Sequence, residues 1–310
     1  MSISETPINV VICTHDRLQL LQRTLESLQH VEQPPTFEHF WIIENGSDSG
    51  AQQMCAEFAS TLPLEYRNLK PKGKSRALQY SLDEIRRGLV IFTDDDVRVA
   101  PGWLKAYAKQ STQSGPNFFY GGPLYIDYEV APADWMLSHM PPSVRGWRLD
   151  DPTAPITKPC FLGANYAAYV ENLQAVGGFK TSLGMGATGN PIGEEFEIQD
   201  RLLANGYKAM YVGDAPAWHY VPRNRSSIRW VLNRHERIWF TSGMTDNKHH
   251  PGRRIFGIPG WMWRSLVFYA TAAVRANLIT DAERRFEIKK SYYQWKGYVR
   301  GVKMRQLHSE

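Results

Sequence analysis

The chain has 310 residues, of which 43% are hydrophobic and 22% are charged. This composition allows a sizeable core, so it argues against a disordered chain and predicts one large domain or a domain with an appendage. Cys13, Cys55 and Cys160 have no CxxC spacing, which argues against a disulfide framework or a zinc site and fits a reducing compartment. The N-terminus has no basic start followed by an apolar segment, so we expect no secretory signal.

The net charge of +5 is distributed unevenly along the chain. Residues 1–220 contain 18 Lys and Arg against 25 Asp and Glu, a net −7, whereas residues 221–310 contain 18 against 6, a net +12. This asymmetry predicts an anionic partner surface, either nucleic acid or a phospholipid membrane, and composition alone does not choose between them. Solvated basic side chains without a partner are the alternative.

The first 120 residues alternate short apolar runs with segments of helical periodicity. Ile8–Cys13 predicts a strand. The helical spacing of Leu18, Leu21, Leu25 and Leu28 predicts a helix after it, with Asp16 as its N-cap. Further strands are predicted at 40–43, 64–68, 89–93 and 118–122, and helices at about 51–60 and 74–87 and from about 100 onward, with Pro101 in the first turn. This alternation predicts an α/β fold with a mostly parallel, doubly wound sheet, whose ligands bind at the carboxyl ends of the strands.

Three consecutive aspartates, Asp94, Asp95 and Asp96, follow the predicted strand at 89–93. Carboxylates this close repel one another unless a cation lies among them, so they predict a divalent-metal site, with Mn²⁺ or Mg²⁺ favoured by the hard oxygen ligands. Strand alternation predicts that Asp94 and Asp96 point into the site and that Asp95 turns away. A solvated acidic turn is the alternative.

The loops at the other strand ends are polar or charged. The loop after the first strand has no glycine, so a dinucleotide fingerprint and a phosphate loop are both absent, which argues against a dehydrogenase or a P-loop NTPase. The side chains that could bind a nucleobase, a ribose or a diphosphate are Thr14, Asp16, Glu44, Asn45, Lys74 and Arg76. With a metal ion they predict a nucleoside diphosphate site, although each alone is more often a cap or a surface group.

Beyond residue 120 the pattern is less regular. Residues 127–158 are rich in proline and predict an irregular, lid-like loop over the active-site face, with a surface insertion as the alternative. A glycine-rich loop at 183–190 then leads to Glu194 and Glu195 at the start of a helix, and His219 follows a strand predicted at 210–212. An acidic pair at a helix start can serve the helix dipole alone, and a histidine after a strand is more often a packed residue.

In their order and spacing these segments resemble glycosyltransferase family two, the inverting enzymes of the GT-A fold, and in particular bacterial members that elongate cell-surface or secreted glycans. The resemblance covers roughly residues 7–245. The segments that carry it are 11–17, 44–47, 73–77, 92–96, 177–179, 193–195, 201–207 and 211–219. It implies a Rossmann-like catalytic domain at 1–245, with a nucleotide-binding half at about 1–120, an acceptor-binding half at 121–245 and a basic, amphipathic helical extension at 246–310.

The same resemblance assigns roles to the acidic residues. It makes the three aspartates a DxD motif, with Asp96 as a metal ligand and with Asp94 and Asp95 on the donor side. It makes His219 a second metal ligand. Glu195 matches the catalytic base of the family, and because many members have Glu-Asp at this position, Glu194 stays open as the alternative.

The mechanism implied is direct displacement at the anomeric carbon of a sugar. The metal neutralises the charge that develops on the leaving nucleoside diphosphate, and Glu195 accepts the proton of the acceptor hydroxyl. The partners implied are a nucleoside diphosphate sugar, with a UDP-sugar as the first choice, and a glycan or lipid-linked acceptor, with no nucleic acid. A metal-dependent nucleotidyltransferase and a non-catalytic glycan-binding module are the competing interpretations.

Residues 259–279 form an apolar segment with aromatic residues at its start. Arg264, Thr271 and Arg275 share one face of the predicted helix, so a spanning helix is not expected. Flanking basic residues favour an interfacial helix, which predicts a cytoplasmic protein attached to the inner face of the cell membrane. The alternative is that the apolar face packs on the catalytic domain or on a second subunit, as in a homodimer formed through the C-terminal helices.

Overall fold

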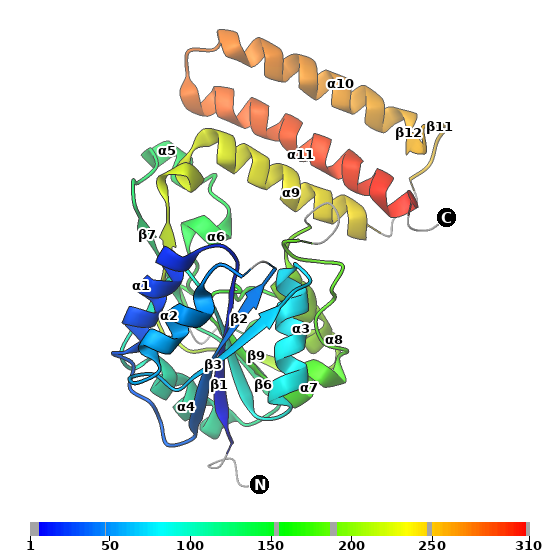
Figure 1. Cartoon of the computed structure of the whole chain (residues 1–310). Helices are drawn as coiled ribbons and strands as arrows, with labels where there is room; N and C mark the ends of the chain where they lie inside the picture. Colours follow the sequence, from blue (N-terminus) through cyan, green and yellow to red (C-terminus); the bar gives the residue numbers. More distant parts are fainter. Residues whose placement is uncertain (1–5, 47, 152–154, 187–190, 247–249, 308–310) are drawn as a thin grey trace. The chain divides into compact units, whose positions relative to one another are not determined.

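The computed structural model describes residues 6–46, 48–151, 155–186, 191–246 and 250–307. The chain divides into two compact units, which can be followed by colour in Figure 1. The first unit comprises Met1–Asp127, Arg145–Thr188 and Glu194–Tyr220, and the second comprises Tyr128–Val144, Gly189–Gly193 and Val221–Glu310. The second unit therefore takes in the whole basic part of the sequence, from residue 221 onward, rather than only residues 246–310.

The first unit is built on a seven-stranded sheet with the order β3-β2-β1-β4-β8-β6-β9. Its strands are β1 (Ile8–Thr14), β2 (Phe37–Asn45), β3 (Leu64–Leu69), β4 (Leu89–Asp94), β6 (Phe118–Gly121), β8 (Tyr166–Tyr169) and β9 (Lys208–Tyr211). Strands β1 to β4 pair in parallel, and β8 runs antiparallel to both of its neighbours, β4 and β6. The prediction of a mostly parallel sheet is confirmed.

Successive residues of the central strands point to opposite faces of the sheet, and each face has its own apolar cluster. Val10 and Ile12 pack with α1 (Leu18–Leu28), α2 (Ala51–Phe58) and α4 (Trp103–Ser114). Val11 and Phe92 pack with α3 (Lys74–Ile85), α7 (Val170–Ala175) and α8 (Glu194–Ala204). Because both faces are buried, the strands are continuously apolar, and the sheet is doubly wound as predicted.

Two helices start later than the sequence predicts. α1 begins at Leu18 with Arg17 at the N-cap position and no side-chain cap, so the prediction that Asp16 caps this helix is wrong. Asp16 instead has a φ of 52°, in the left-handed region, and its carboxylate lies 3.3 Å from the His15 ring. α4 begins at Trp103, so Pro101 lies in the turn before the helix.

The segment predicted as an irregular loop contains more regular structure than expected. A three-stranded sheet with the order β5-β10-β7 is formed by β5 (Val97–Val99), β7 (Leu124–Tyr128) and β10 (Ala217–Val221). Two short helices follow β7, namely α5 (Asp134–Leu137) and α6 (Pro142–Arg145). Backbone hydrogen bonds of 2.8 Å in both directions then pair Trp147 with Leu124. Residues 152–154 lie outside the described residues, and the role of the segment as a lid stays a prediction.

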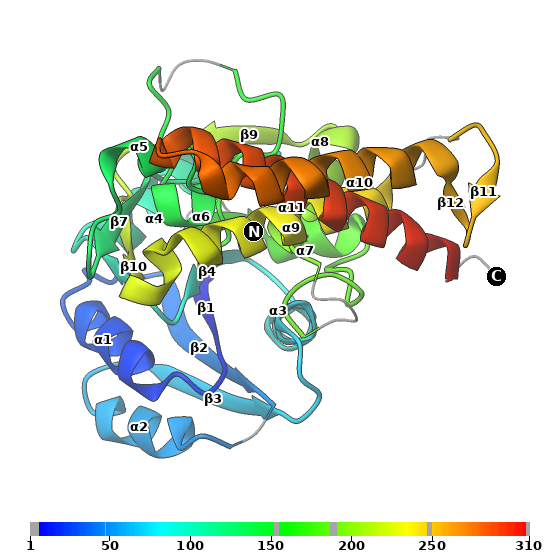
Figure 2. The same cartoon turned by 90° about the horizontal axis from the view of Figure 1, so that it is seen from above.

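The second unit is built around three helices, α9 (Ile228–Thr245), α10 (Gly260–Arg275) and α11 (Ala282–Leu307), of which α11 packs on both of the others (Figures 1 and 2). Short elements connect them, namely η2 (Arg223–Ser226), the β11–β12 hairpin (Arg254–Ile255 and Ile258–Pro259) and η3 (Ala276–Leu278). Glycines bring α9 and α11 into backbone contact. A Cβ atom on Gly297 would lie 2.0 Å from the carbonyl oxygen of Glu236, and one on Gly301 would lie 2.1 Å from that of Phe240.

The apolar face at the start of α10 is packed rather than exposed. Trp261, Trp263 and Leu266 pack against a buried cluster formed by Ile258, Met262, Val299 and Val302. This part of the predicted apolar segment therefore rests on α11 of the same unit, whereas Val267, Phe268, Val274 and Leu278 of the same segment are exposed. Attachment to a membrane stays a prediction. Among the helices that the structure describes, none is both long and apolar enough to cross a membrane.

Candidate functional site

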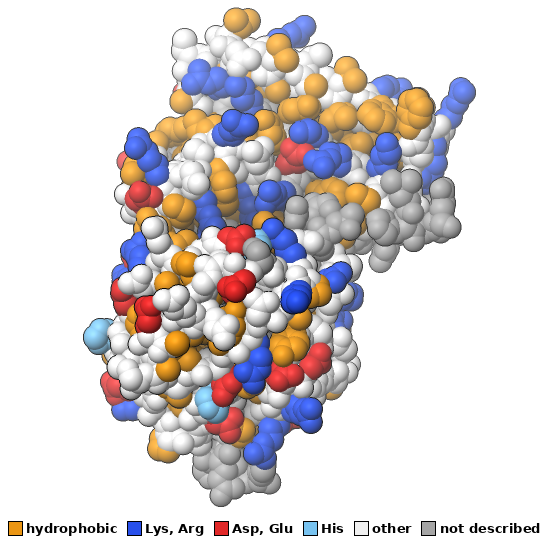
Figure 3. All heavy atoms as spheres, in the orientation of Figure 1, with side chains coloured by type: hydrophobic (Ala, Val, Ile, Leu, Met, Phe, Trp, Pro, Cys, Tyr) orange, Lys and Arg blue, Asp and Glu red, His pale blue; other side chains and the backbone are white. Residues whose placement is uncertain are grey.

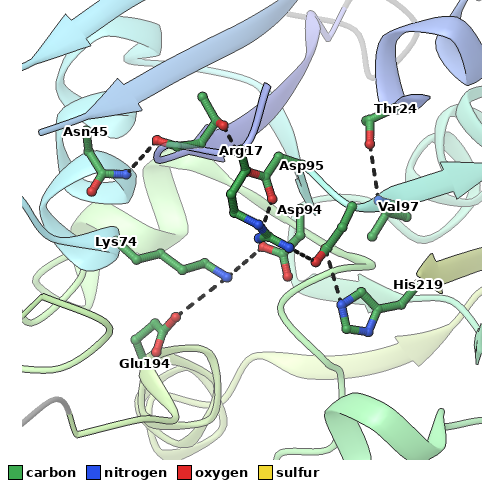
Figure 4. Close-up of polar contacts among 11 residues, drawn as sticks. Arg17, Thr24, Asn45, Lys74, Asp94, Asp95, Val97, Glu194 and His219 are labelled. Atoms are coloured by element: carbon green, nitrogen blue, oxygen red, sulfur yellow. Dashed lines mark hydrogen bonds and ion pairs between the residues drawn. The ribbon is translucent and has the colours of Figure 1, made fainter. Parts of the chain in front are cut away.

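The three aspartates lie where β4 ends and the chain turns towards β5. Asp94 is the last residue of β4, and its Oδ1 lies 2.6 Å from Nζ of Lys74 (Figure 4). Asp95 and Asp96 both pair with Arg17. Because β4 ends at Asp94, strand alternation does not fix the directions of Asp95 and Asp96. That Asp94 and Asp96 point into the ligand site stays a prediction.

Arg17 neutralises two buried carboxylates at once. One of its amino groups lies 2.6 Å from Oδ1 of Asp95, and the other donates a hydrogen bond to Asp96. The hydroxyl of Thr14 donates a further hydrogen bond of 2.8 Å to Asp95. Burial raises the pKa of Asp95 to about 7, although the charge of Arg17 opposes the shift. The sequence analysis did not identify Arg17, although it is a cation in the loop that faces the aspartates.

Asp96 and His219, the two predicted metal ligands, lie in contact. Nε2 of His219 lies 3.2 Å from Oδ1 of Asp96, and both side chains are buried. The pair arises because β10 lies beside β5 with His219 opposite Val97, the residue after Asp96. Among the described residues, no cluster of three or more His, Cys, Asp or Glu side chains could hold a metal ion. Two protein ligands nevertheless fit a Mn²⁺ or Mg²⁺ ion whose remaining ligands are substrate phosphates and water.

The two candidate bases occupy the first turn of α8. Glu194 is buried, and its carboxylate lies 3.8 Å from Nζ of Lys74, whereas Glu195 is partly exposed. Burial lowers the pKa of Lys74, but the charges of Asp94, Glu194 and Glu195 outweigh this effect and raise it. Lys74 therefore stays protonated and links the end of β4 to the start of α8 (Figure 4).

Tyr166 is a second residue that the sequence analysis missed. It lies opposite Phe92 in the β4–β8 pairing and stacks on its ring at 4.8 Å between centroids. Its hydroxyl is buried and has no hydrogen-bond partner among the described residues. Burial raises its pKa, and the nearby charges of Glu195 and Glu194 raise it further. Buried polar atoms in proteins nearly always have a hydrogen-bond partner, so a buried hydroxyl without one often marks a functional site. The Tyr166 hydroxyl lies near the two candidate bases, Glu194 and Glu195.

Two predicted donor-binding residues, Glu44 and Asn45, use their polar side-chain atoms inside the protein. Glu44 is fully buried and accepts hydrogen bonds from the Tyr66 hydroxyl at 2.5 Å and from the Ser49 amide at 2.8 Å. Asn45 donates to the carbonyl oxygen of Thr14 at 3.1 Å and accepts from the Gly73 amide at 3.0 Å. These side chains hold the strand-end loops in place, and their direct contact with a ligand stays a prediction.

A pocket of about 730 Å³ lies at the carboxyl ends of β1, β2 and β3. Its lining residues are mostly polar, namely His15, Asp16, Gly46, Asp48, Gln52, Tyr66, Asn68, Lys70 and Lys72. Gly46 has a φ of 111°, and a Cβ atom there would lie 2.9 Å from the His15 ring, so this position favours glycine. Of the predicted donor-binding residues, Asp16 lines this pocket, whereas Arg76 is exposed and does not.

Three solved structures show the same fold. The mannosyltransferase PcManGT from Pyrobaculum calidifontis, in complex with GDP-Man and Mn²⁺, has a TM-score of 0.61 and 19% identity, covering 96% of this chain and 87% of that chain. GalNAc-T7, with UDP, GalNAc and Mn²⁺, has a TM-score of 0.54 and 15% identity, covering 93% and 54%. TarS 1–349 from S. aureus has a TM-score of 0.54 and 14% identity, covering 98% and 92%. These likenesses confirm the predicted GT-A fold.

A search of curated proteins found no match to the chain. A family profile, however, does match the sequence. The profile described as Glycosyl transferase family 2 matches residues 9–171, which is more than half of the chain. The match runs from β1 through Lys74 and the three aspartates into α7, and it ends before α8 and His219. The chain belongs to glycosyl transferase family 2, and it is a glycosyltransferase enzyme.

Proposed function

We propose that the enzyme transfers a sugar, with inversion, from a nucleoside diphosphate donor to a hydroxyl of a glycan or lipid-linked acceptor. The observation that carries this proposal is a set of ion pairs in one site. Asp96 pairs with His219 and with Arg17, and Lys74 pairs with Asp94 and with Glu194 at the start of α8. A UDP-sugar is the first donor to test. TarS 1–349 has been solved with UDP-GlcNAc, and PcManGT with GDP-Man.

The polar pocket at the ends of β1, β2 and β3 is the proposed site of the nucleoside. Its volume of about 730 Å³ lies within the range of small-molecule sites. Asp16, Asp48 and Asn68 offer acceptors and a donor for a nucleobase and ribose, while Lys70 and Lys72 can attract phosphate. Thr14, Glu44 and Asn45 contribute by fixing the loops around this pocket.

The donor diphosphate is proposed to lie beside Asp96 and His219. A Mn²⁺ or Mg²⁺ ion held by these two side chains would supply positive charge to the leaving diphosphate. Asp95 stays bound by Thr14 and Arg17 in a buried position, so it orients the loop. Asp94 is held by Lys74 at the end of β4, on the side of the glutamates. There its carboxylate can accept a hydrogen bond from a hydroxyl group of the donor.

Glu195 is the proposed general base, and Glu194 is the alternative. Glu194 is buried and its carboxylate lies 3.8 Å from the ammonium group of Lys74, which leaves it little access to an acceptor. Glu195 is adjacent in sequence but partly exposed, so it can meet an acceptor hydroxyl and remove its proton as the bond to the sugar forms. Both residues offer a carboxylate, and they differ mainly in how exposed that carboxylate is to an acceptor.

The proposal is tested by incubating the protein with a panel of nucleotide sugars and Mn²⁺ and measuring the release of nucleoside diphosphate. We expect Glu195→Gln to bind UDP normally but to lose about 10²–10⁴-fold in turnover, while Glu194→Gln keeps more activity. We expect Asp96→Asn to lose Mn²⁺-dependent UDP binding in calorimetry, with the exposed Asp83→Asn as the matched control.

The outcomes separate the alternatives. Full turnover by Glu195→Gln would mean that Glu194 or another residue is the base. Unchanged UDP affinity of Asp96→Asn in the presence of Mn²⁺ would mean that Asp96 is not a metal ligand. Release of pyrophosphate from a nucleoside triphosphate, with no nucleoside diphosphate from any sugar donor, would indicate a nucleotidyltransferase. The acceptor is identified separately, by transfer to glycans and lipid-linked saccharides. A lipid-linked acceptor would suit the predicted position at the inner face of the cell membrane.

A further inference from the structure

The outer face of α10 carries apolar and basic side chains at helical spacing. Exposed residues recur every three or four positions along α10 and η3, at Arg264, Val267, Phe268, Thr271, Val274, Arg275 and Leu278. Residues at this spacing share one face of a helix. Phe268 is 66% exposed and Leu278 is 86% exposed, although the other face of the same helix is packed on α11. This exposed face belongs to the apolar segment of residues 259–279 that the sequence analysis identified.

The β11–β12 hairpin, which leads directly into α10, adds an aromatic tip. Phe256 is 83% exposed and has a φ of 50°, a conformation that costs free energy for a bulky side chain. The hairpin holds this conformation through its strand pairing and through a 3.0 Å hydrogen bond from the indole of Trp263 to the carbonyl oxygen of Ile255. A strained backbone that presents an aromatic ring to solvent indicates a contact surface.

The charged residues of the segment that forms this face have one sign. Residues 251–280 contain four arginines and no aspartate or glutamate. Figure 3 shows hydrophobic and basic side chains gathered over the C-terminal helices. Beside the face lies a groove of about 500 Å³ between α9, α10 and α11. The basic residues Arg229 and Lys289 line this groove together with Val274 and Tyr292. Cations beside an apolar wall suit an anionic headgroup with attached acyl chains.

We propose that this α10 surface, defined as the hairpin tip Ile255–Phe256 and the exposed residues from Arg264 to Leu278, docks on an anionic lipid bilayer. Its apolar side chains enter the headgroup boundary, and the arginines contact lipid phosphates. A second copy of the chain fits less well. A two-fold contact through this face would bring its arginines together without any carboxylate between them. The docking requires none of the proposed transfer chemistry.

The test is cosedimentation of the full chain with vesicles, using equal parts of phosphatidylcholine and phosphatidylglycerol and, in parallel, phosphatidylcholine alone. We expect binding to the anionic vesicles that weakens as salt rises. Each exposed arginine removed, as in Arg264→Gln or Arg275→Gln, should lower the partition coefficient about fivefold. The Phe256→Ser/Phe268→Ser variant should lower it at least about tenfold. The matched controls are Val130→Ser and Lys109→Gln, which change exposed residues elsewhere.

Circular dichroism and thermal unfolding verify that each variant is folded, which is expected because all the substituted side chains are exposed. Absence of binding at low salt would overturn the proposal, and so would binding that persists in the Phe256→Ser/Phe268→Ser variant. A dimer in sedimentation that Phe268→Ser converts to a monomer, with no vesicle binding, would assign the face to a second copy instead. Because no nucleotide sugar is present, these outcomes are independent of the test of the transferase.

Discussion

At the scale of single residues, the site is organised around two partly buried cations. Arg17 compensates Asp95 and Asp96, and Lys74 compensates Asp94 and Glu194. Carboxylates this close and this buried would otherwise repel one another. Since Asp96 also contacts His219, the guanidinium of Arg17 supplies the positive charge that a metal ion would supply at the same aspartate. Arg17 and the proposed metal ion would therefore share the carboxylate of Asp96.

We expect Arg17→Ala to lower the free energy of unfolding without metal by up to about 3 kcal/mol, because two buried carboxylates lose their cation. Added Mn²⁺ should then raise the melting temperature more in the variant than in the wild type, since the metal restores the missing charge and stabilises by binding the folded state. Differential scanning fluorimetry with and without Mn²⁺ measures both effects.

The matched control for this prediction is Lys105→Ala, which removes an exposed ion pair with Glu32. An exposed pair contributes about 1 kcal/mol or less, so this variant should melt near the wild type and respond to Mn²⁺ in the same way. An equal response to Mn²⁺ in Arg17→Ala and in the wild type would show that the metal does not act on the carboxylates that Arg17 holds.

The sequence points to some residues of the site but not to all of them. The three aspartates are an unusual local pattern, whereas His219 was singled out only through the family resemblance. Their role as metal ligands stays a prediction. Arg17 and Tyr166 could not be predicted, because their roles depend on which strand end or strand lies beside them in space. The directions of Asp95 and Asp96 could not be read from strand periodicity, because both residues lie beyond the end of β4.

At the scale of elements, backbone contact between α9 and α11 forms the core of the second unit. Gly297 and Gly301 are one turn apart on α11, and each faces a carbonyl group of α9. Glu236 of α9 is in turn paired with Lys296 at 2.9 Å and with Arg300, so ion pairs flank the glycine contact. Small residues at such positions allow two helix backbones to approach closely.

We expect Gly297→Ala to destabilise the second unit by about 1–3 kcal/mol, because its Cβ atom would lie 2.0 Å from a backbone oxygen that cannot move away cheaply. Thermal or urea unfolding followed by tryptophan fluorescence measures the loss. Gly102→Ala is the matched control, since no atom lies within 4 Å of the added methyl group. Equal stability of the two variants would mean that α9 and α11 are not in backbone contact.

Periodicity predicted the elements of the first unit because their apolar residues face one continuous core. β1 to β4 and the helices between them were found within a few residues of their observed bounds. For α10, periodicity did not predict which face is packed. Its sequence is apolar on more than one face, and the choice between the packed face and the exposed face depends on the aromatic residues of α11, about 30 residues away in sequence.

At the scale of the whole molecule, the charge asymmetry follows the division into units. The net −7 of residues 1–220 and the net +12 of residues 221–310 divide at the point where the second unit resumes, at Val221. The basic charge therefore belongs to a compact helical unit and not to a disordered tail. This bears on how its role can be tested, because a deletion within that unit removes packing as well as charge.

We expect a chain truncated after Gly252 to aggregate rather than to lose only its proposed membrane binding. The truncation removes α10 and α11, which exposes Val231, Leu232 and Phe240 on α9 and leaves the buried Glu236 without its two cations. Size-exclusion chromatography with a dye that binds exposed apolar surface would detect this. The full-length Phe256→Ser/Phe268→Ser variant, which removes exposed side chains only, should elute like the wild type. A monomeric truncated chain with an unchanged melting temperature would mean that α9 folds without α11 and that the deletion is a clean probe of the α10 surface.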